Sequence, residues 1–150
     1  MEQEEILKDL INKFIIQSET ENLKTKEFLI NYNNYKIFCS FGKGVKSKVP
    51  WLAFLKSKYE IQRGIYPILM FYTELKKIVI AFGVSEEFTP NRNWTLKDNY
   101  LTIGEYFLNS EIIQKKYLES KVYKFYELEQ INYDEIINDL SVVFEIYEKQ

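Results

Sequence analysis

Residues 42–47 of this chain, GKGVKS, combine two glycines with lysines, a composition suited to contact with an anion. The glycines permit a bend in which the backbone approaches a ligand closely, and Lys43, Lys46 and Lys48 supply positive charge. Trp51 follows directly after Pro50, so an indole stands beside a rigid turn and several cations. Lysines contact phosphates and aromatic rings stack on bases, so the segment indicates contact with a nucleic acid.

The positive charge is local. The whole chain carries a formal net charge of −2, yet between residues 43 and 63 the only acidic residue is Glu60. It is outnumbered there by Lys43, Lys46, Lys48, Lys56, Lys58 and Arg63. A local cluster of this kind predicts one basic surface on an otherwise acidic protein.

Composition excludes several kinds of catalysis. The chain has no histidine and a single cysteine, Cys39, so it can form neither a Ser-His-Asp triad, nor a cysteine/histidine zinc site, nor an internal disulfide. The glycine segment also lacks the four-residue glycine spacing of a phosphate-binding loop. Glu74 beside Lys76 and Lys77 lacks the spaced acidic pair of a nuclease site. We therefore expect no catalysis and no cofactor.

The elements that must position these residues follow from hydrophobic periodicity. Residues 4–17 and a segment after Asn132 have helical spacing, and Asn132 is a suitable N-cap. Thr102 and Glu105 form a capping-box pattern that predicts a short helix through Asn109. Strands are predicted at residues 35–40, 51–55, 65–72, 78–85 and 121–128, and residues 86–97 are predicted to be a loop.

At 150 residues the chain has the length of one domain, residues 1–150. We expect an α+β fold, in which a mainly antiparallel, bent β-sheet is packed by the N- and C-terminal helices. No apolar run is long enough to cross a bilayer and no secretion signal is present, so a cytoplasmic location is expected.

The aromatic residues divide into two groups. Bulky strand residues usually fill a core, and we predict this for Phe38, Phe54, Phe71 and Phe82. Five other aromatics could belong either to the core or to a binding site, and they are Trp51, Tyr66, Tyr72, Trp94 and Tyr117.

Four segments of the sequence resemble one family. They read YNNYKIFCSFGKGVKSKVPWLAFL, GIYPILMFY, IVIAFGVSEEFTPNRNW and TIGEYF. In order and spacing they are similar to the N-terminal DNA-binding domain of the McrB family, the recognition and motor subunits of modification-dependent restriction systems. The similarity runs from Phe28 to Phe144.

The resemblance implies that the domain binds double-stranded DNA with a modified cytosine, flips that base and holds it in a side-chain pocket. Pocket positions of the family correspond to Trp51, Tyr66, Met70 and Tyr117. The roles implied are stacking for Trp51 and Tyr66 and contact with a methyl group for Met70. In the full-length context, an AAA+ GTPase domain and a separate nuclease subunit are the implied partners.

One position departs from the family pattern. Lys43 stands between two glycines where the family's best-known member has a tyrosine that fills the gap left by the flipped base. A lysine cannot stack as a ring, so Lys43 either contacts a phosphate, or donates to the orphaned guanine, or is solvated. Contacts with the DNA backbone are expected from Lys43, Lys46, Lys48 and Lys116.

A different class of function is compatible with the same residues. The aromatic face could dock a partner protein and the acidic C-terminal helix could contact a neighbouring subunit, with no DNA involved. Salt dependence separates the two, because neutralising phosphates makes affinity fall steeply with salt concentration.

Overall fold

The computed structural model describes residues 2–56, 65–84, 100–107 and 120–149. These residues form one six-stranded antiparallel sheet with strand order β1-β2-β3-β4-β5-β6, accompanied by three α-helices. The strands are β1 (Asn31–Tyr32), β2 (Tyr35–Lys43), β3 (Val45–Lys56), β4 (Ile65–Tyr72), β5 (Lys77–Val84) and β6 (Lys121–Glu127). Every strand pairs with its neighbour in the sequence, and the expected α+β fold with a mainly antiparallel sheet is confirmed.

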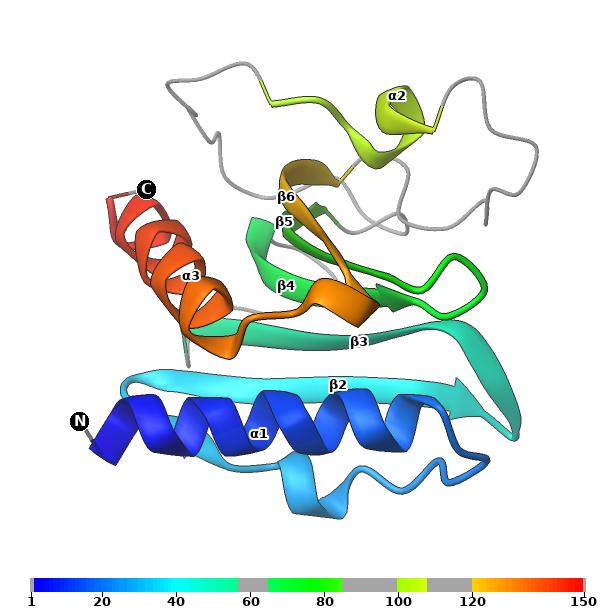
Figure 1. The fold of residues 1–150 in the computed structure, drawn as a ribbon. Helices are drawn as coiled ribbons and strands as arrows, with labels where there is room; N and C mark the ends of the chain where they lie inside the picture. The colour runs from blue at the N-terminus through cyan, green and yellow to red at the C-terminus, as the bar shows by residue number, and fades with distance from the viewer. Residues whose placement is uncertain (1, 57–64, 85–99, 108–119, 150) are drawn as a thin grey trace.

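The two long helices are terminal, as expected. They are α1 (Glu2–Ser18) and α3 (Tyr133–Glu148), and α1 runs along β2 in Figure 1. The Asn132 side chain caps α3 by accepting from the backbone N–H groups of Asp134 and Glu135. The apolar stripe of α3 is buried, which confirms the predicted helix.

The short helix α2 (Ile103–Tyr106) begins with the predicted capping box. Thr102 accepts from the N–H of Glu105 at 3.1 Å, and the Glu105 carboxylate accepts from the N–H of Thr102 at 3.1 Å. These bonds hold the pKa of Glu105 below its usual range. The helix is shorter than expected, because Phe107 is already its C-cap.

Sequence reasoning missed three short elements. They are β1 and the two 3-10 helices η1 (Lys26–Phe28) and η2 (Leu128–Gln130). Such elements are too brief for a hydrophobic period to develop. Strand β3 is also longer than predicted, because the lysine-rich segment before Trp51 pairs with β2 although it has no apolar alternation.

The sheet separates two hydrophobic clusters. One face contributes alternate residues such as Leu52, Phe54 and Phe71 to a cluster with α1 and α3. The opposite face contributes Ala53, Tyr66 and other residues to a second cluster with α2. Two-residue periodicity along each strand explains this division.

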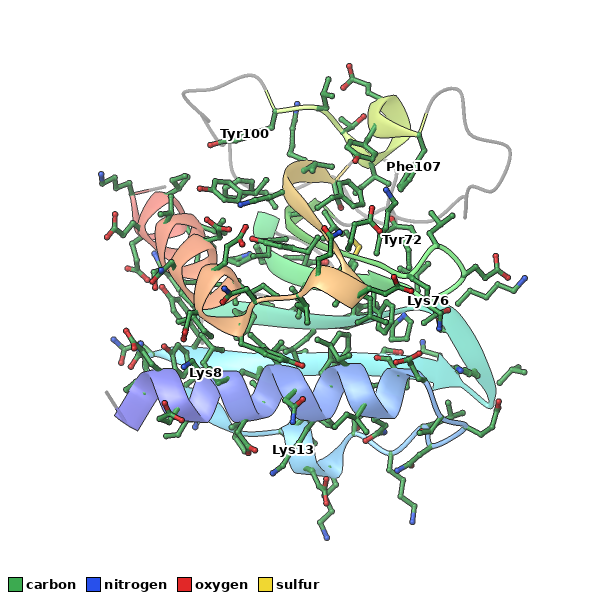
Figure 2. All side chains as sticks on the ribbon, in the orientation of Figure 1. Lys8, Lys13, Tyr72, Lys76, Tyr100 and Phe107 are labelled. Atoms are coloured by element: carbon green, nitrogen blue, oxygen red, sulfur yellow. The ribbon has the colours of Figure 1, made fainter. Side chains whose placement is uncertain are left out.

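The second cluster joins the sheet to α2 through aromatic rings. The rings of Tyr72 on β4 and Phe107 beside α2 lie 5.5 Å apart, and both are labelled in Figure 2. Tyr106 stacks on Phe125 of β6 with ring centroids 4.0 Å apart. Among the described residues, the predicted pocket residues Trp51, Tyr66 and Met70 therefore share a face with α2, away from the two long helices.

Candidate nucleic-acid interface

Three of the predicted pocket residues lie on one face of the sheet. Trp51 on β3 is directly opposite Met70 on β4 in the strand register, and Tyr66 precedes Met70 by four residues on the same face. At the usual rise of a strand, Tyr66 and Met70 are about 13 Å apart along β4. The structure thus places a tryptophan, a tyrosine and a methionine on one face of two neighbouring strands.

These three side chains differ in exposure. Trp51 is half-buried, whereas Tyr66 has 7% of its surface exposed and Met70 has 0%. A base could therefore reach Trp51 directly, but contact with Met70 requires atoms that cover it in this structure to move.

The ring of Tyr66 is positioned by a glycine on the next strand. Gly83 on β5 lies opposite Tyr66, and a Cβ atom at Gly83 would lie 2.7 Å from Cε2 of the tyrosine ring. No side chain could occupy that position without displacing the ring. The neighbouring row of this face has small residues at Ala53 and Ala81, which flank Ile68 in the register.

The glycine segment forms the tip of the β2–β3 hairpin. Lys43 pairs with Val45, with Gly44 between them, and Gly42 pairs with Lys46. Gly42 has a φ of 128° and a Cβ there would lie 2.0 Å from the carbonyl oxygen of Val45, so only glycine fits. Gly44 has a φ of 73° but open space around it. Lys43 therefore lies in a turn between two glycines, of which Gly42 is required by a close backbone contact and Gly44 only by its positive φ.

The three hairpin lysines have different surroundings. Lys43 is exposed and Lys46 is half-buried, and within the described part of the chain neither forms an ion pair. The Nζ atom of Lys48 lies 3.0 Å from a carboxylate oxygen of Glu74, in the turn between β4 and β5. Lys48 thus already has an anionic partner within the protein.

The same turn also holds the backbone of Lys48. The carbonyl oxygen of Lys48 accepts from the N–H of Thr73 at 3.1 Å and from its Oγ1 hydroxyl at 2.9 Å. These two bonds fix the base of the hairpin relative to the central strands. Sequence reasoning missed Thr73, because a contact across 25 residues leaves no local signal.

Two other predicted residues, Tyr117 and Lys116, lie outside the described residues, as do Trp94 and the predicted loop at residues 86–97. The described residues of the candidate interface are therefore Trp51, Tyr66, Met70 and the hairpin lysines.

The prediction that Phe38 is a core residue needs correction. Phe54, Phe71 and Phe82 are fully buried, but Phe38 is only half-buried. It lies opposite Ala53 in the register and packs against the same cluster as Trp51. The reason is positional, because β2 lies near the edge of the sheet, where less of this face is covered. The sequence alternation could have indicated this, because Phe38 lies on the opposite face of β2 from its neighbours Ile37 and Cys39.

Cys39 is not a candidate nucleophile. It lies half-buried on β2, and burial raises the pKa of its thiol to about 12. At neutral pH it is protonated. Among the described residues, no group of three or more cysteines and carboxylates is arranged to hold a metal ion.

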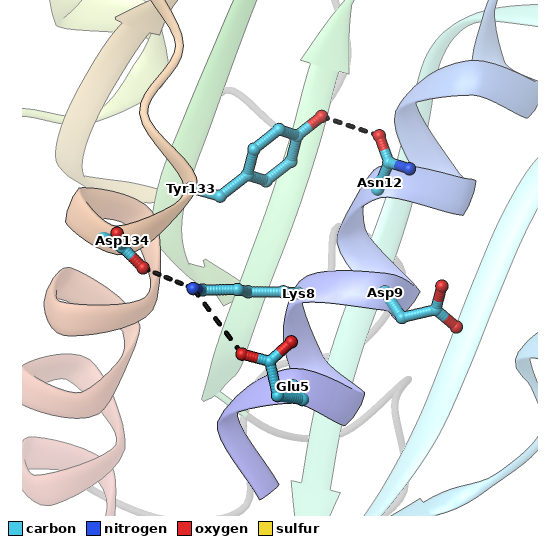
Figure 3. A pocket seen from close by; sticks show the side chains of 6 residues that line it. All are labelled: Glu5, Lys8, Asp9, Asn12, Tyr133 and Asp134. Carbon is cyan, nitrogen blue, oxygen red and sulfur yellow. Dashed lines mark hydrogen bonds and ion pairs between the residues drawn. The ribbon is translucent and has the colours of Figure 1, made fainter. Parts of the chain in front are cut away.

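An open crevice of about 560 Å³ lies between α1 and the start of α3. Figure 3 shows that its polar groups contact one another: Lys8 pairs with Asp134 and lies 3.8 Å from Glu5, and the Tyr133 hydroxyl donates to Asn12 at 3.0 Å. These contacts join the two terminal helices. The crevice is therefore explained by helix packing.

None of the helices in the described ranges combines the length and the apolar character that a membrane crossing requires.

Comparison of this chain with known proteins identifies its family. Residues 2–87 match the family model described as "MrcB-like, N-terminal domain", and the chain belongs to this family. It is 33% identical to the type IV methyl-directed restriction enzyme EcoKMcrB subunit of Escherichia coli strain K12. That similarity covers 93% of this chain and 33% of the relative, so the chain spans about a third of the relative's length.

Proposed function

We propose that this domain binds double-stranded DNA and recognises a modified cytosine, which it flips out of the helix, as the targeting domain of a restriction system. One observation carries the proposal: β3 begins at a turn with two lysines that have no ion pair among the described residues, and continues to Trp51 opposite Met70. The β2–β3 hairpin thus joins cations suited to phosphates with a ring suited to a base.

In this proposal Lys43 and Lys46 contact the DNA backbone. Phosphate contacts of this kind orient the protein on the duplex and supply most of the affinity. The turn at Gly42 and Gly44 presents the exposed Lys43, and the Thr73 bonds to Lys48 fix the base of the turn. Lys116 and Tyr117 remain proposed contacts of the same interface.

Trp51 and Tyr66 stack on the extruded base and Met70 contacts its modification. Flipping costs a few kcal/mol, and stacking returns about 1–3 kcal/mol per base, so two rings roughly offset the cost. One buried methyl group adds only about 0.8 kcal/mol, or about fourfold in affinity. Since Met70 is flexible as well as buried, the pocket would tolerate more than one cytosine modification.

The domain has no catalytic activity of its own in this proposal. The chain spans about a third of the restriction-enzyme subunit to which it is similar. In this proposal an AAA+ GTPase domain and a separate nuclease subunit act on the DNA that the domain has bound, in the cytoplasm.

The test is a binding titration of the 150-residue chain by fluorescence anisotropy at two salt concentrations. One duplex contains 5-methylcytosine after a purine and the other has unmodified cytosine. We expect tighter binding to the modified duplex and a linear fall of log affinity with log salt. Absence of binding to both duplexes at low salt would contradict the proposal and leave docking of a partner protein as the function of the aromatic face.

A further inference from the structure

The turn between β4 and β5 contacts Lys48 in three ways. Thr73 donates two hydrogen bonds to the Lys48 carbonyl, at 3.1 and 2.9 Å, and Glu74 pairs with the Lys48 ammonium at 3.0 Å. The Thr73 N–H and Oγ1 bonds keep the two segments together, which places Glu74 beside the hairpin.

We propose that Glu74 is an internal competitor of DNA phosphate at Lys48 and thereby limits the affinity of the domain for DNA of any sequence. This inference rests on the proposed DNA-binding function. A carboxylate and a phosphate oxygen form the same kind of charge-assisted hydrogen bond with an ammonium group. A phosphate that contacts Lys48 therefore competes with Glu74 for the ammonium charge.

Exposure makes this exchange possible. The Lys48 side chain is 62% exposed and that of Glu74 is 42% exposed, so the pair is accessible to DNA and weak enough to open. Lys43 and Lys46, on the same hairpin, have no such partner among the described residues. The hairpin thus has two lysines that are available for phosphates and one that is restrained.

Restraint of one lysine has a measurable consequence. A lysine that stays paired with a carboxylate neutralises no phosphate and therefore releases no counterion from the DNA. The salt dependence of binding thus reports how many lysines are available to phosphates. Glu74→Gln retains the size of the side chain and removes its charge. We expect it to tighten binding about twofold to fivefold, the range that an exposed ion pair supports. The slope of log affinity against log salt should steepen by about 0.9, or one additional phosphate.

The experiment measures binding of the 5-methylcytosine duplex and of its unmodified counterpart over a range of salt concentrations. It compares the unaltered chain with Glu74→Gln, Lys48→Met and the double variant. Asp9→Asn is the matched control, because it makes the same charge change and releases Lys13 from an ion pair of the same 3.0 Å length. The control pair lies on a different element from the Lys48–Glu74 pair: in Figure 2, Lys13 is on α1, whereas Lys76 marks the β4–β5 turn that contains Glu74.

We expect Glu74→Gln to tighten binding to both duplexes. In the Lys48→Met background, the gain in affinity from Glu74→Gln should be no larger than the gain that Asp9→Asn gives in the unaltered chain. A gain that is absent, that equals that of Asp9→Asn, or that persists in the Lys48→Met background would overturn the inference while the DNA-binding function stands. If neither the unaltered chain nor Glu74→Gln binds either duplex, both the inference and the proposed function are wrong.

Discussion

Trp51 and Met70 form a directly opposed cross-strand pair between β3 and β4, in which the indole is half-buried and the thioether is fully buried. Opposed residues on antiparallel strands have Cβ atoms about 4.5–5.5 Å apart, so the two side chains are direct neighbours. A base stacked on Trp51 would therefore be adjacent to Met70, once the atoms that cover the methionine move aside.

Replacing Trp51 tests this pair. Trp51→Ala should lose about 1–3 kcal/mol of binding to the 5-methylcytosine duplex, because the stacking ring is gone, while weak binding to unmodified DNA persists through the lysines. Anisotropy titrations of both duplexes measure the ratio. Trp51→Phe keeps a ring and should retain most of the preference. Equal loss for both duplexes together with a lowered Tm would indicate a folding defect and count against a role in recognition.

The two hairpin glycines should respond differently to substitution. Gly44→Ala should cost about 1–2 kcal/mol of stability, because φ is 73° but no atom lies within 4 Å of the new Cβ. Gly42→Ala should cost more, because its Cβ would meet the Val45 carbonyl oxygen at 2.0 Å. Urea unfolding of the two variants checks the order. Equal losses would show that the hairpin tip relaxes freely.

Gly83 and Tyr66 should be coupled energetically. Gly83→Ala should destabilise the protein by about 1–3 kcal/mol, because the methyl group displaces the Tyr66 ring. In a Tyr66→Ala background the cost should be smaller, and a double-mutant cycle by chemical denaturation measures the difference. A cost that is the same in both backgrounds would assign the effect to Ile68, whose Cγ2 lies 3.1 Å from the same Cβ position.

Stability should depend on the ionisation of Cys39 at alkaline pH. Burial raises the pKa of the folded thiol to about 12 from an ordinary value of 9.0. The unfolded chain therefore ionises first, and the stability contributed by the neutral thiol is complete below about pH 9 and is lost as pH rises towards 12. The loss is at most about 1.4 kcal/mol per pH unit, and partial exposure of the side chain reduces it.

Denaturant unfolding between pH 8 and 10 checks this dependence. Cys39→Ala should show a shallower loss than the unaltered chain in this window, because the buried tyrosines, whose pKa values are also raised, act mainly above pH 10. Alkylation by iodoacetamide at pH 8 should also be slower than for a free thiol. Identical pH slopes and rapid alkylation would contradict a protonated, protected Cys39.

Much of the fold could be predicted from local patterns. The period of α1, the Asn132 cap of α3 and the capping box at Thr102 are encoded within a few residues of one another, and each was confirmed. Strand β4 matches its predicted bounds, Ile65–Tyr72, because it is a continuous apolar run that ends at a turn.

The site could be predicted only in part. Alternation placed Tyr66 and Met70 on one face, but the register that sets Trp51 opposite Met70 depends on pairing between strands. The Lys48–Glu74 pair and the Gly83 contact with Tyr66 are likewise products of tertiary structure, separated by many residues in the sequence. Their partners could not be found from spacing alone.

The separation of the two clusters has a consequence for how such a domain can diversify. The helix-packed face, with Leu52, Phe54 and Phe71, supports the fold, whereas Trp51, Tyr66 and Met70 belong to a cluster on the other side of the same strands. Residues one apart in the sequence thus belong to different clusters. New ligand preferences can arise by changing alternate positions of β3 and β4 while the residues between them preserve the scaffold.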